Sequence, residues 1–397
     1  MNTSKLKSLA AAVALSCAST GAMADMTIAE ADDGTKLSMF GIIDVGVLYQ
    51  DKFTAQAEDT LQIESSGMRQ SVFGWKGSRP MFNGSTVFFN LEAHFDIDSG
   101  MFHNTADDLR GADADDESGN LAFRRQANLG MTGDWGTVIV GRQYGPALLA
   151  HLASEPRVFR ENFSNLYAWA YTQLFNDINA ANAGGRNTNN DVGIFMKNSV
   201  QYRNNLQGLD FGILYSFGGV EGSLEDNSIL ALGASYPIGN VTLTGSWQQM
   251  KDQQTGNSLT DHWSVGAAYK MNDFTFRANY MDAKNETQAG VDVLDFSGLG
   301  LGVEWAWNEK NALIVAYYNN EDDTNAGGTG GSAETDSWVI SNDYLIAPST
   351  TLYSVLSVVD VDANAGQVAN FATSIVANPA PVGETTTFVN VGVNYQF

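Results

Sequence analysis

Cysteine is nearly absent from this sequence. The one cysteine, Cys17, lies in an N-terminal segment that we expect to be removed. Residues 1–24 place basic residues before an apolar run and end in a small-residue pattern at Ala22 and Ala24, as a cleaved signal peptide does. The apolar run is about half the ~20 residues of a spanning helix, which disfavours a membrane anchor. A mature chain from Asp25 onward would have no thiol, which excludes disulfides, cysteine catalysis and cysteine-bound zinc.

Positive charge and long apolar runs are also scarce. The chain has 21 lysines and arginines against 45 aspartates and glutamates, a formal net charge of −24, so we expect no nucleic-acid partner. Beyond the first segment no stretch approaches ~18 consecutive apolar residues, so a membrane could be crossed only by strands. No linker-like tract divides residues 25–397, which favours one large domain.

What the sequence does contain is strand-like alternation. Between residues 86 and 98 every second position is apolar, and polar or charged residues fill most of the positions between them. The pattern predicts sixteen strands, at 37–50, 65–77, 85–98, 121–132, 135–144, 195–203, 209–217, 228–236, 239–249, 261–271, 274–283, 297–307, 311–320, 336–345, 349–360 and 386–397.

The connections between these strands alternate strictly between short turns and long loops. Bacterial outer-membrane barrels have short turns at the periplasmic rim and long loops outside. All seven prolines fall in connections, as expected if every strand is bonded on both sides. A soluble sandwich would need a second layer to cover the apolar face, and none is apparent. We therefore predict an all-β fold, a 16-stranded antiparallel transmembrane β-barrel.

Six local stretches carry a more specific signal. They are 41–47 (GIIDVGV), 71–78 (SVFGWKGS), 125–131 (RQANLGM), 136–144 (GTVIVGRQY), 198–202 (NSVQY) and 392–397 (GVNYQF). In this order they resemble the general Gram-negative porin family. The resemblance implies an outer-membrane homotrimer that passes ions and small hydrophilic solutes, and contacts with lipopolysaccharide and outer-membrane lipid. It also implies that the terminal Phe397 is recognised by the barrel-assembly machinery.

The resemblance further implies a third loop folded into the lumen as the constriction. Residues 145–194 are the longest connection and stand in its place, but they are rich in asparagine and aromatic residues and lack an obvious acidic cluster. The aromatics could form a stacking slide for an oligosaccharide or, as we favour, pack the loop against the wall; they are Phe163, Tyr167, Trp169, Tyr171 and Phe175.

Charged residues on the expected lumen face are the candidate pore-lining set. Strand parity selects Asp44, Lys76, Glu92 and Asp96, and Arg142 ends the fifth strand. Arg124 and Arg125 are adjacent; alternation favours the first and the family pattern the second, so the choice stays open. We expect these basic residues to face Glu155 and Glu161 of the long loop. The alternative is that all are ordinary solvated wall charges.

Two further patterns bear on function. Acidic residues crowd the long connections, among them 107–108, 113–117, 221–226 and 321–323, and we expect them to give a negative mouth with mild cation preference, which could also bind divalent cations.

The glycines of 298–302 lack the spacing and helix of a dinucleotide loop, so we interpret them as inward-facing strand glycines. The four histidines are scattered, and we expect no catalytic residue, metal or cofactor. The remaining alternatives to a general diffusion pore are a substrate-specific channel, an adhesin or a barrel enzyme.

Overall fold

The computed structural model describes residues 25–52, 58–102, 122–178, 187–191, 193–324, 331–365 and 380–397. The expected signal peptide (1–24) and the acidic residues 107–117 lie outside these residues, as do the side chains of Tyr171 and Phe175.

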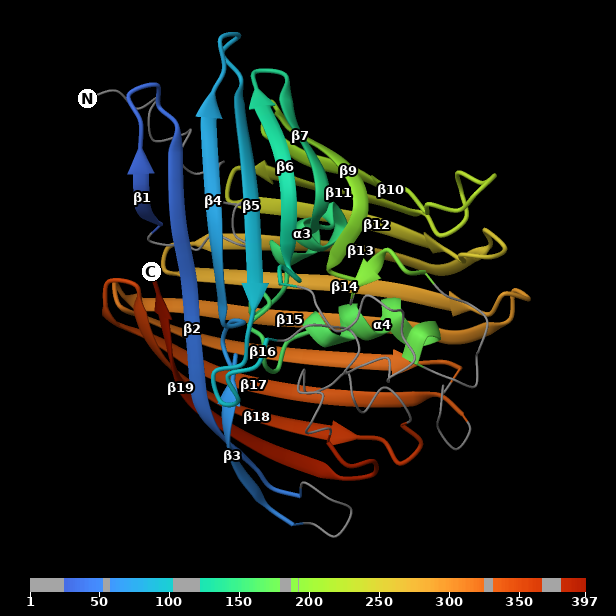
Figure 1. The fold of residues 1–397 in the computed structure, drawn as a ribbon. Helices are drawn as coiled ribbons and strands as arrows, with labels where there is room; N and C mark the ends of the chain where they lie inside the picture. Colours follow the sequence, from blue (N-terminus) through green and yellow to red (C-terminus); the bar gives the residue numbers. More distant parts are fainter. Residues whose placement is uncertain are drawn as a thin grey trace.

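The described residues form one antiparallel sheet (Figure 1). Its strands are β1 (Met26–Glu30), β2 (Lys36–Gln50), β3 (Thr60–Ser65), β4 (Val72–Pro80), β5 (Thr86–His94), β6 (Gln126–Gly133), β7 (Gly136–Tyr144), β8 (Asn190–Asp191), β9 (Phe195–Leu206), β10 (Leu209–Ser216), β11 (Ile229–Ile238), β12 (Val241–Lys251), β13 (Ser258–Met271), β14 (Phe274–Glu286), β15 (Asp292–Asn308), β16 (Asn311–Asp322), β17 (Ala333–Ala347), β18 (Thr350–Val361) and β19 (Thr385–Gln396).

The sheet closes on itself because β19 pairs with β2. β3 and β4 pair with successive parts of β2 and count as one barrel strand, and β8 is a two-residue bridge to β9. β1 pairs with residues 36–39 of β2, beyond the part of β2 that pairs with β19. The result is the predicted 16-stranded antiparallel barrel. The prediction of one continuous strand over 65–77 was wrong, because residues 66–71 interrupt it. β1 was not predicted.

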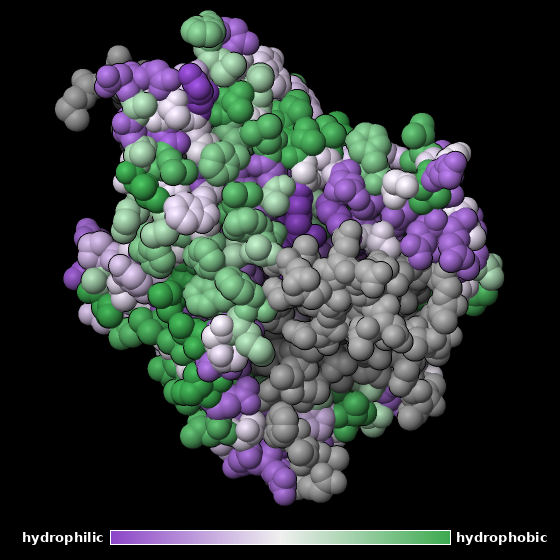
Figure 2. Space-filling view, in the orientation of Figure 1, coloured by the Kyte–Doolittle hydropathy of each residue, from purple (hydrophilic) through white to green (hydrophobic). Residues whose placement is uncertain are grey.

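Alternation along the strands separates two faces of the wall. In β18, Tyr353, Val355 and Val359 are buried inside, whereas Leu352 and Leu356 are each 43% exposed outside. Apolar side chains are likewise exposed outside on many other strands, and in Figure 2 green atoms cover much of the wall formed by β2, β4 and β5. An outward apolar belt is what a barrel needs in order to face lipid.

The connection from residue 145 to 194 is called here the inward loop, and its described parts, 145–178, 187–191 and 193–194, lie inside the barrel (Figure 1). It carries α3 (Pro146–Leu152) and α4 (Leu166–Ile178), which contact β10–β13 and β13–β15 respectively. Glycines of the inner wall make room for it: a Cβ on Gly233 would lie 1.9 Å from the carbonyl oxygen of Pro146, and one on Gly302 would lie 2.6 Å from the Cβ of Pro156. The interpretation of 298–302 as inward-facing strand glycines is confirmed. No helix among the described residues is long and apolar enough to span a membrane.

Candidate pore constriction

The interruption at residues 66–71, called here the break segment, is fixed to the wall by Asp44. The Asp44 side chain is fully buried rather than facing an open lumen. Its carboxylate accepts hydrogen bonds from the backbone N–H groups of Met68 and Arg69, the Tyr353 hydroxyl and the Asn394 amide, at 3.3, 3.0, 2.9 and 2.7 Å. A carboxylate with this many donors stabilises local backbone that leaves the ladder. Asp44 therefore fixes the break segment in place and does not line the cavity described below.

The break segment in turn holds the inward loop. The carbonyl oxygen of Met68 accepts the N–H of Glu161 at 3.0 Å, and that of Gly67 accepts the N–H of Asn162 at 3.1 Å. The Gln70 amide donates to Glu161 Oε1 at 2.6 Å. Backbone groups freed by the interruption thus find partners in the loop, as buried backbone groups must.

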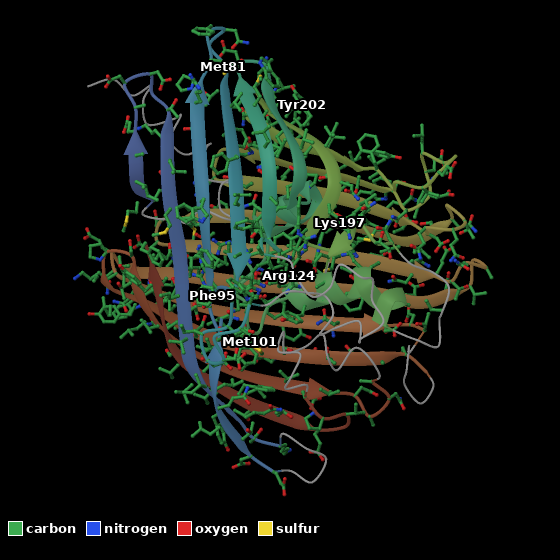
Figure 3. The ribbon with its side chains drawn as sticks, in the orientation of Figure 1. Met81, Phe95, Met101, Arg124, Lys197 and Tyr202 are labelled. Carbon is green, nitrogen blue, oxygen red and sulfur yellow. The ribbon has the colours of Figure 1, made fainter. Side chains whose placement is uncertain are left out.

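A second attachment lies at the far end of the inward loop, around Asp191. Arg124 donates to both carboxylate oxygens of Asp191 at 3.1 Å, and Arg142 donates to the same carboxylate. All three side chains are less than 10% exposed. Figure 3 places Arg124 between Met81 at one rim and Met101 toward the other, at the level of the loop.

Arg125 also turns inward. Its Nε bonds Glu92 and its Nη2 bonds the Tyr144 hydroxyl, while its guanidinium lies 5.3 Å from the Phe195 ring centre. The sequence left open whether Arg124 or Arg125 faces inward, and in the structure both do. Strand alternation does not apply to them, because β6 begins only at Gln126.

The middle of the inward loop is a tight charged turn. The Glu155 carboxylate accepts the N–H groups of Arg157 and Phe159 at 2.8 and 2.6 Å, and the Tyr318 hydroxyl at 2.6 Å. Complete burial raises the pKa of Glu155, partly offset by these hydrogen bonds. Glu155 thus organises the turn from within the loop, whereas Arg142, which it was expected to face, donates to Asp191.

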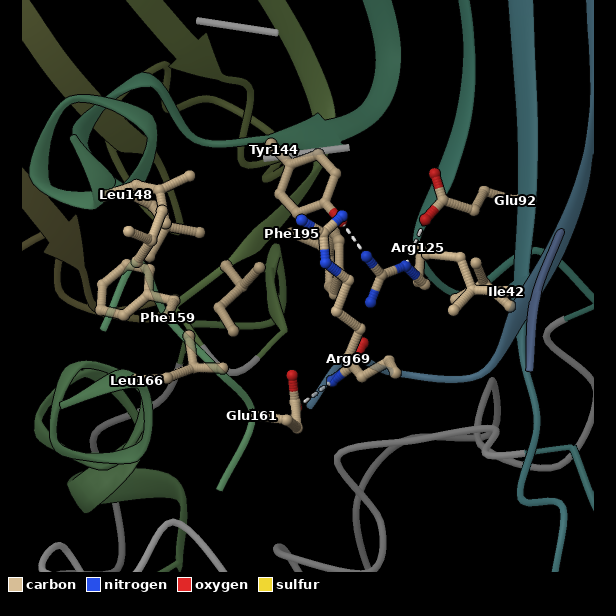
Figure 4. Close-up of a pocket in the computed structure, with 15 residues that line it drawn as sticks. Ile42, Arg69, Glu92, Arg125, Tyr144, Leu148, Phe159, Glu161, Leu166 and Phe195 are labelled. Atoms are coloured by element: carbon tan, nitrogen blue, oxygen red, sulfur yellow. Dashed lines mark hydrogen bonds and ion pairs between the residues drawn. The ribbon is translucent and has the colours of Figure 1, made fainter. Parts of the chain in front are cut away.

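A cavity of about 90 Å³ lies between the inward loop and the wall (Figure 4). Charged residues of the wall and break segment line one side, Arg69, Glu92 and Arg125 among them, and Glu161 of the loop also lines it. The loop otherwise presents apolar side chains, including Leu148 and Phe159. Glu92, Arg125 and Glu161 of the predicted set are therefore brought together around one cavity.

Lys76 and Asp96 lie away from this cavity. The Lys76 ammonium pairs with Asp25 at 3.2 Å and sits 4.3 Å from the Phe40 ring centre. Asp96 Oδ1 lies 3.9 Å from His94 Nε2, just beyond the end of β5. Neither residue lines the narrow region described above.

Aromatic residues of the inward loop pack it against the wall. Trp169 is fully buried between His151 of α3 and His262 of β13, with ring centres 5.1 and 4.1 Å away, and its Nε1 donates to the Gly193 carbonyl at 2.9 Å. Phe163, also buried, lies 5.2 Å from Phe388. These two rings have no face open to a passing sugar, which favours the packing interpretation over a stacking slide.

Burial of His151 should make the docking of the inward loop depend on pH. Burial lowers its pKa to about 3, so docking keeps the ring neutral. The ordinary pKa of histidine is about 6.5. Above that pH the neutral His151 ring contributes its full free energy to docking of the loop, and this contribution is lost as pH falls toward 3. We expect open-channel current noise to rise between pH 7 and pH 4, and His151→Gln to reduce that rise. An identical pH response in both proteins would contradict the assignment.

Several residues of the candidate constriction were not predicted from the sequence. Arg69 and Gln70 reach the cavity only because the break segment leaves the strand, and the one available signal was Ser65-Ser66-Gly67 inside a predicted strand. Asp191 and Arg157 sit in the long loop, where no periodicity constrains side chains. Among the described residues no group of three or more histidines and carboxylates could hold a metal ion.

A closed barrel with a loop folded onto its inner wall and an arginine cluster at that level defines a class of outer-membrane channel protein, and sequence comparison gives the family. A sequence model of the Gram-negative porin family matches residues 9–364, so the chain belongs to the Gram-negative porin family. The predicted resemblance and the outer-membrane location are thereby confirmed.

Individual relatives agree with this. Outer membrane porin protein 32 of Delftia acidovorans is 24% identical over 286 residues, covering 65% of this chain and 74% of that protein. An anion-selective porin from Comamonas acidovorans superposes with a TM-score of 0.72 at 19% identity, over 91% of this chain and all of that one. OmpT, an outer membrane protein of Vibrio cholerae, gives 0.64 at 12% identity, over 93% and 99%. At these identities the structures show the fold alone.

Proposed function

We propose that this porin is a general diffusion pore for ions and small hydrophilic solutes, and that it works by passive permeation without bond-making. The observation that carries the proposal is the closed barrel together with the cavity between the inward loop and the wall, which is lined by charges of both signs. Charged rings at a constriction bias what passes by electrostatics and size.

A general pore is favoured over an oligosaccharide channel because Phe163 and Trp169 are buried in packing contacts. Liposome swelling separates the two. A general pore admits sugars at rates that fall smoothly with size and do not saturate. Saturating uptake of one sugar class, or swelling rates unrelated to size, would contradict the general pore. An adhesin would give no swelling at all.

The quaternary structure and surface partners belong to the same proposal. One solved structure of Vibrio cholerae OmpT is described as a trimer form, which supports a homotrimer here. The exposed apolar belt supports contacts with outer-membrane lipid and lipopolysaccharide. Phe397 closes the last strand by two backbone hydrogen bonds to Gly41, at 2.8 and 3.0 Å, and we expect it to serve the barrel-assembly machinery as well.

We further propose mild cation preference, set at the mouth rather than at the constriction. In the constriction, guanidinium groups are paired with carboxylates, as Arg125 is with Glu92 and Arg160 with Asp343. Acidic residues at the loop ends, such as Glu221 and Asp323, are exposed and would concentrate cations. Anion preference is the second candidate, supported by the arginine cluster and by the name of the anion-selective relative.

The salt dependence of the reversal potential decides between these candidates. A mouth-based cation preference should be clear in KCl gradients at or below about 0.1 M and should shrink toward zero near 1 M, where the Debye length falls to about 3 Å. A reversal potential on the chloride side would contradict it and support the arginine cluster as the selective element.

A further inference from the structure

The cavity beside the inward loop has two unlike sides. Leu148, Val158, Phe159 and Leu166 of the loop form an apolar side, continued by Ile194. Opposite them, Figure 4 shows Arg69 and Arg125 reaching into the cavity. An apolar surface offers no favourable interaction to water or to a hydrated ion, so the passage of ions does not explain the apolar side.

Arg125 has donor capacity left on the cavity side. Its Nε and Nη2 are used by Glu92 and Tyr144, and within the described part of the chain its Nη1 donates to no other group. Figure 4 shows this second terminal nitrogen directed into the cavity. A planar guanidinium with free N–H groups is suited to binding a carboxylate.

The charges around the cavity balance. Two arginines, Arg69 and Arg125, and two glutamates, Glu92 and Glu161, line it. A solute with a single charge would leave this partly buried group with a net charge of one, which is costly away from bulk water. A solute that carries one positive and one negative group keeps the balance, with its carboxylate near the arginines and its ammonium near Glu161.

The size fits a small solute. A volume of about 90 Å³ corresponds to roughly six to nine water-sized groups at ~10–15 Å³ each, which is the size of a small amino acid. The apolar side lies where a hydrocarbon side chain would rest if the charged end were held at the arginines.

We propose that this cavity is a subsite for zwitterionic α-amino acids with apolar side chains, such as leucine, in a pore that otherwise passes solutes by size. Arg69 and Arg125 bind the carboxylate, Glu161 receives the ammonium group, and the apolar side of the inward loop covers the side chain. The proposal rests on the proposed diffusion function, because the subsite acts only on solutes that reach the constriction.

The test is block of potassium current through single channels of the full-length mature protein by four solutes. Leucine should block at about one tenth of the concentration that serine needs, because only leucine buries an apolar side chain. 4-Methylpentanoate, which lacks the ammonium group, and 3-methylbutylamine, which lacks the carboxylate, should both block more weakly than leucine.

Two variants locate the subsite. Arg69→Gln should raise the half-blocking concentration of leucine several-fold, whereas Arg79→Gln, at an exposed pair with Asp33, should leave it unchanged. Val158→Thr keeps the shape and adds a hydroxyl, and should narrow the difference between leucine and serine. The comparison of solutes on the unaltered protein stands even if a variant fails to assemble.

The possible outcomes distinguish failure of the proposed subsite from failure of the proposed diffusion function. Channels that conduct but are blocked equally by leucine and serine would overturn the subsite and leave the pore intact. Equal block by leucine and 4-methylpentanoate would overturn the zwitterion assignment. Absence of any channel would overturn the diffusion function itself.

Discussion

Replacing residues 147–190 by a short glycine and serine linker will raise the conductance of each channel roughly two- to fourfold, because a sixteen-strand barrel without a loop in its lumen leaves a wide aqueous channel. The intact inward loop fills that space with α3 and α4 and packs them on the inner wall of β10–β15. Its two ends are already joined, since the N–H of Gly145 donates to the Ile194 carbonyl at 3.0 Å, so a short linker can span them.

The measurement is single-channel current in a planar bilayer, with the refolded protein first shown to be a folded barrel by its resistance to unfolding in detergent. The matched control shortens residues 219–224, a connection between β10 and β11 that lies outside the constriction. In 1 M KCl, where the charge of Glu221 is screened, this variant should leave conductance unchanged. An unaltered conductance after removal of the inward loop would mean that the loop does not set the constriction.

Replacing Asp191 by alanine is expected to cost about 3–5 kcal/mol of folding stability, the usual effect of removing one partner from a buried ion pair. Asp191 is the carboxylate shared by Arg124 and Arg142, and all three side chains are nearly inaccessible. Its loss would also free the end of the inward loop from β7. Asp191→Asn, which keeps the shape but not the charge, should fall between alanine and the native protein.

Urea unfolding followed by tryptophan fluorescence measures this effect. Glu225→Ala removes an exposed partner of Lys251 and should cause no measurable change, because exposed pairs contribute little. A native-like midpoint for Asp191→Ala would show that the arginines find other partners and that the attachment is dispensable.

The wall of the barrel was predictable because period-two alternation is imposed on every strand by lipid outside and a filled lumen inside. β2, β7 and β18 begin and end within a residue of the predicted 37–50, 135–144 and 349–360. The break segment escaped prediction because an interruption is decided by tertiary partners. The donors to Asp44 come from the segment itself and from the distant Tyr353 and Asn394.

The constriction was predictable only in part. Glu92 follows strand parity and Arg125 the family motif, and both line the cavity. Glu155 was expected to face the basic wall, but its carboxylate turns back to bond the N–H groups of its own loop. In an irregular loop the local backbone geometry sets the direction of each side chain, and a periodic pattern in the sequence cannot predict it.

Passive permeation through this barrel is tested by single-channel conductance of the mature protein in a planar bilayer across a range of KCl concentrations. A passive aqueous pore predicts long-lived open steps whose size rises with salt and, for the proposed homotrimer, closure in three equal levels. Absence of conductance from protein that is folded by the same detergent assay would contradict the claim that the barrel is an open diffusion pore.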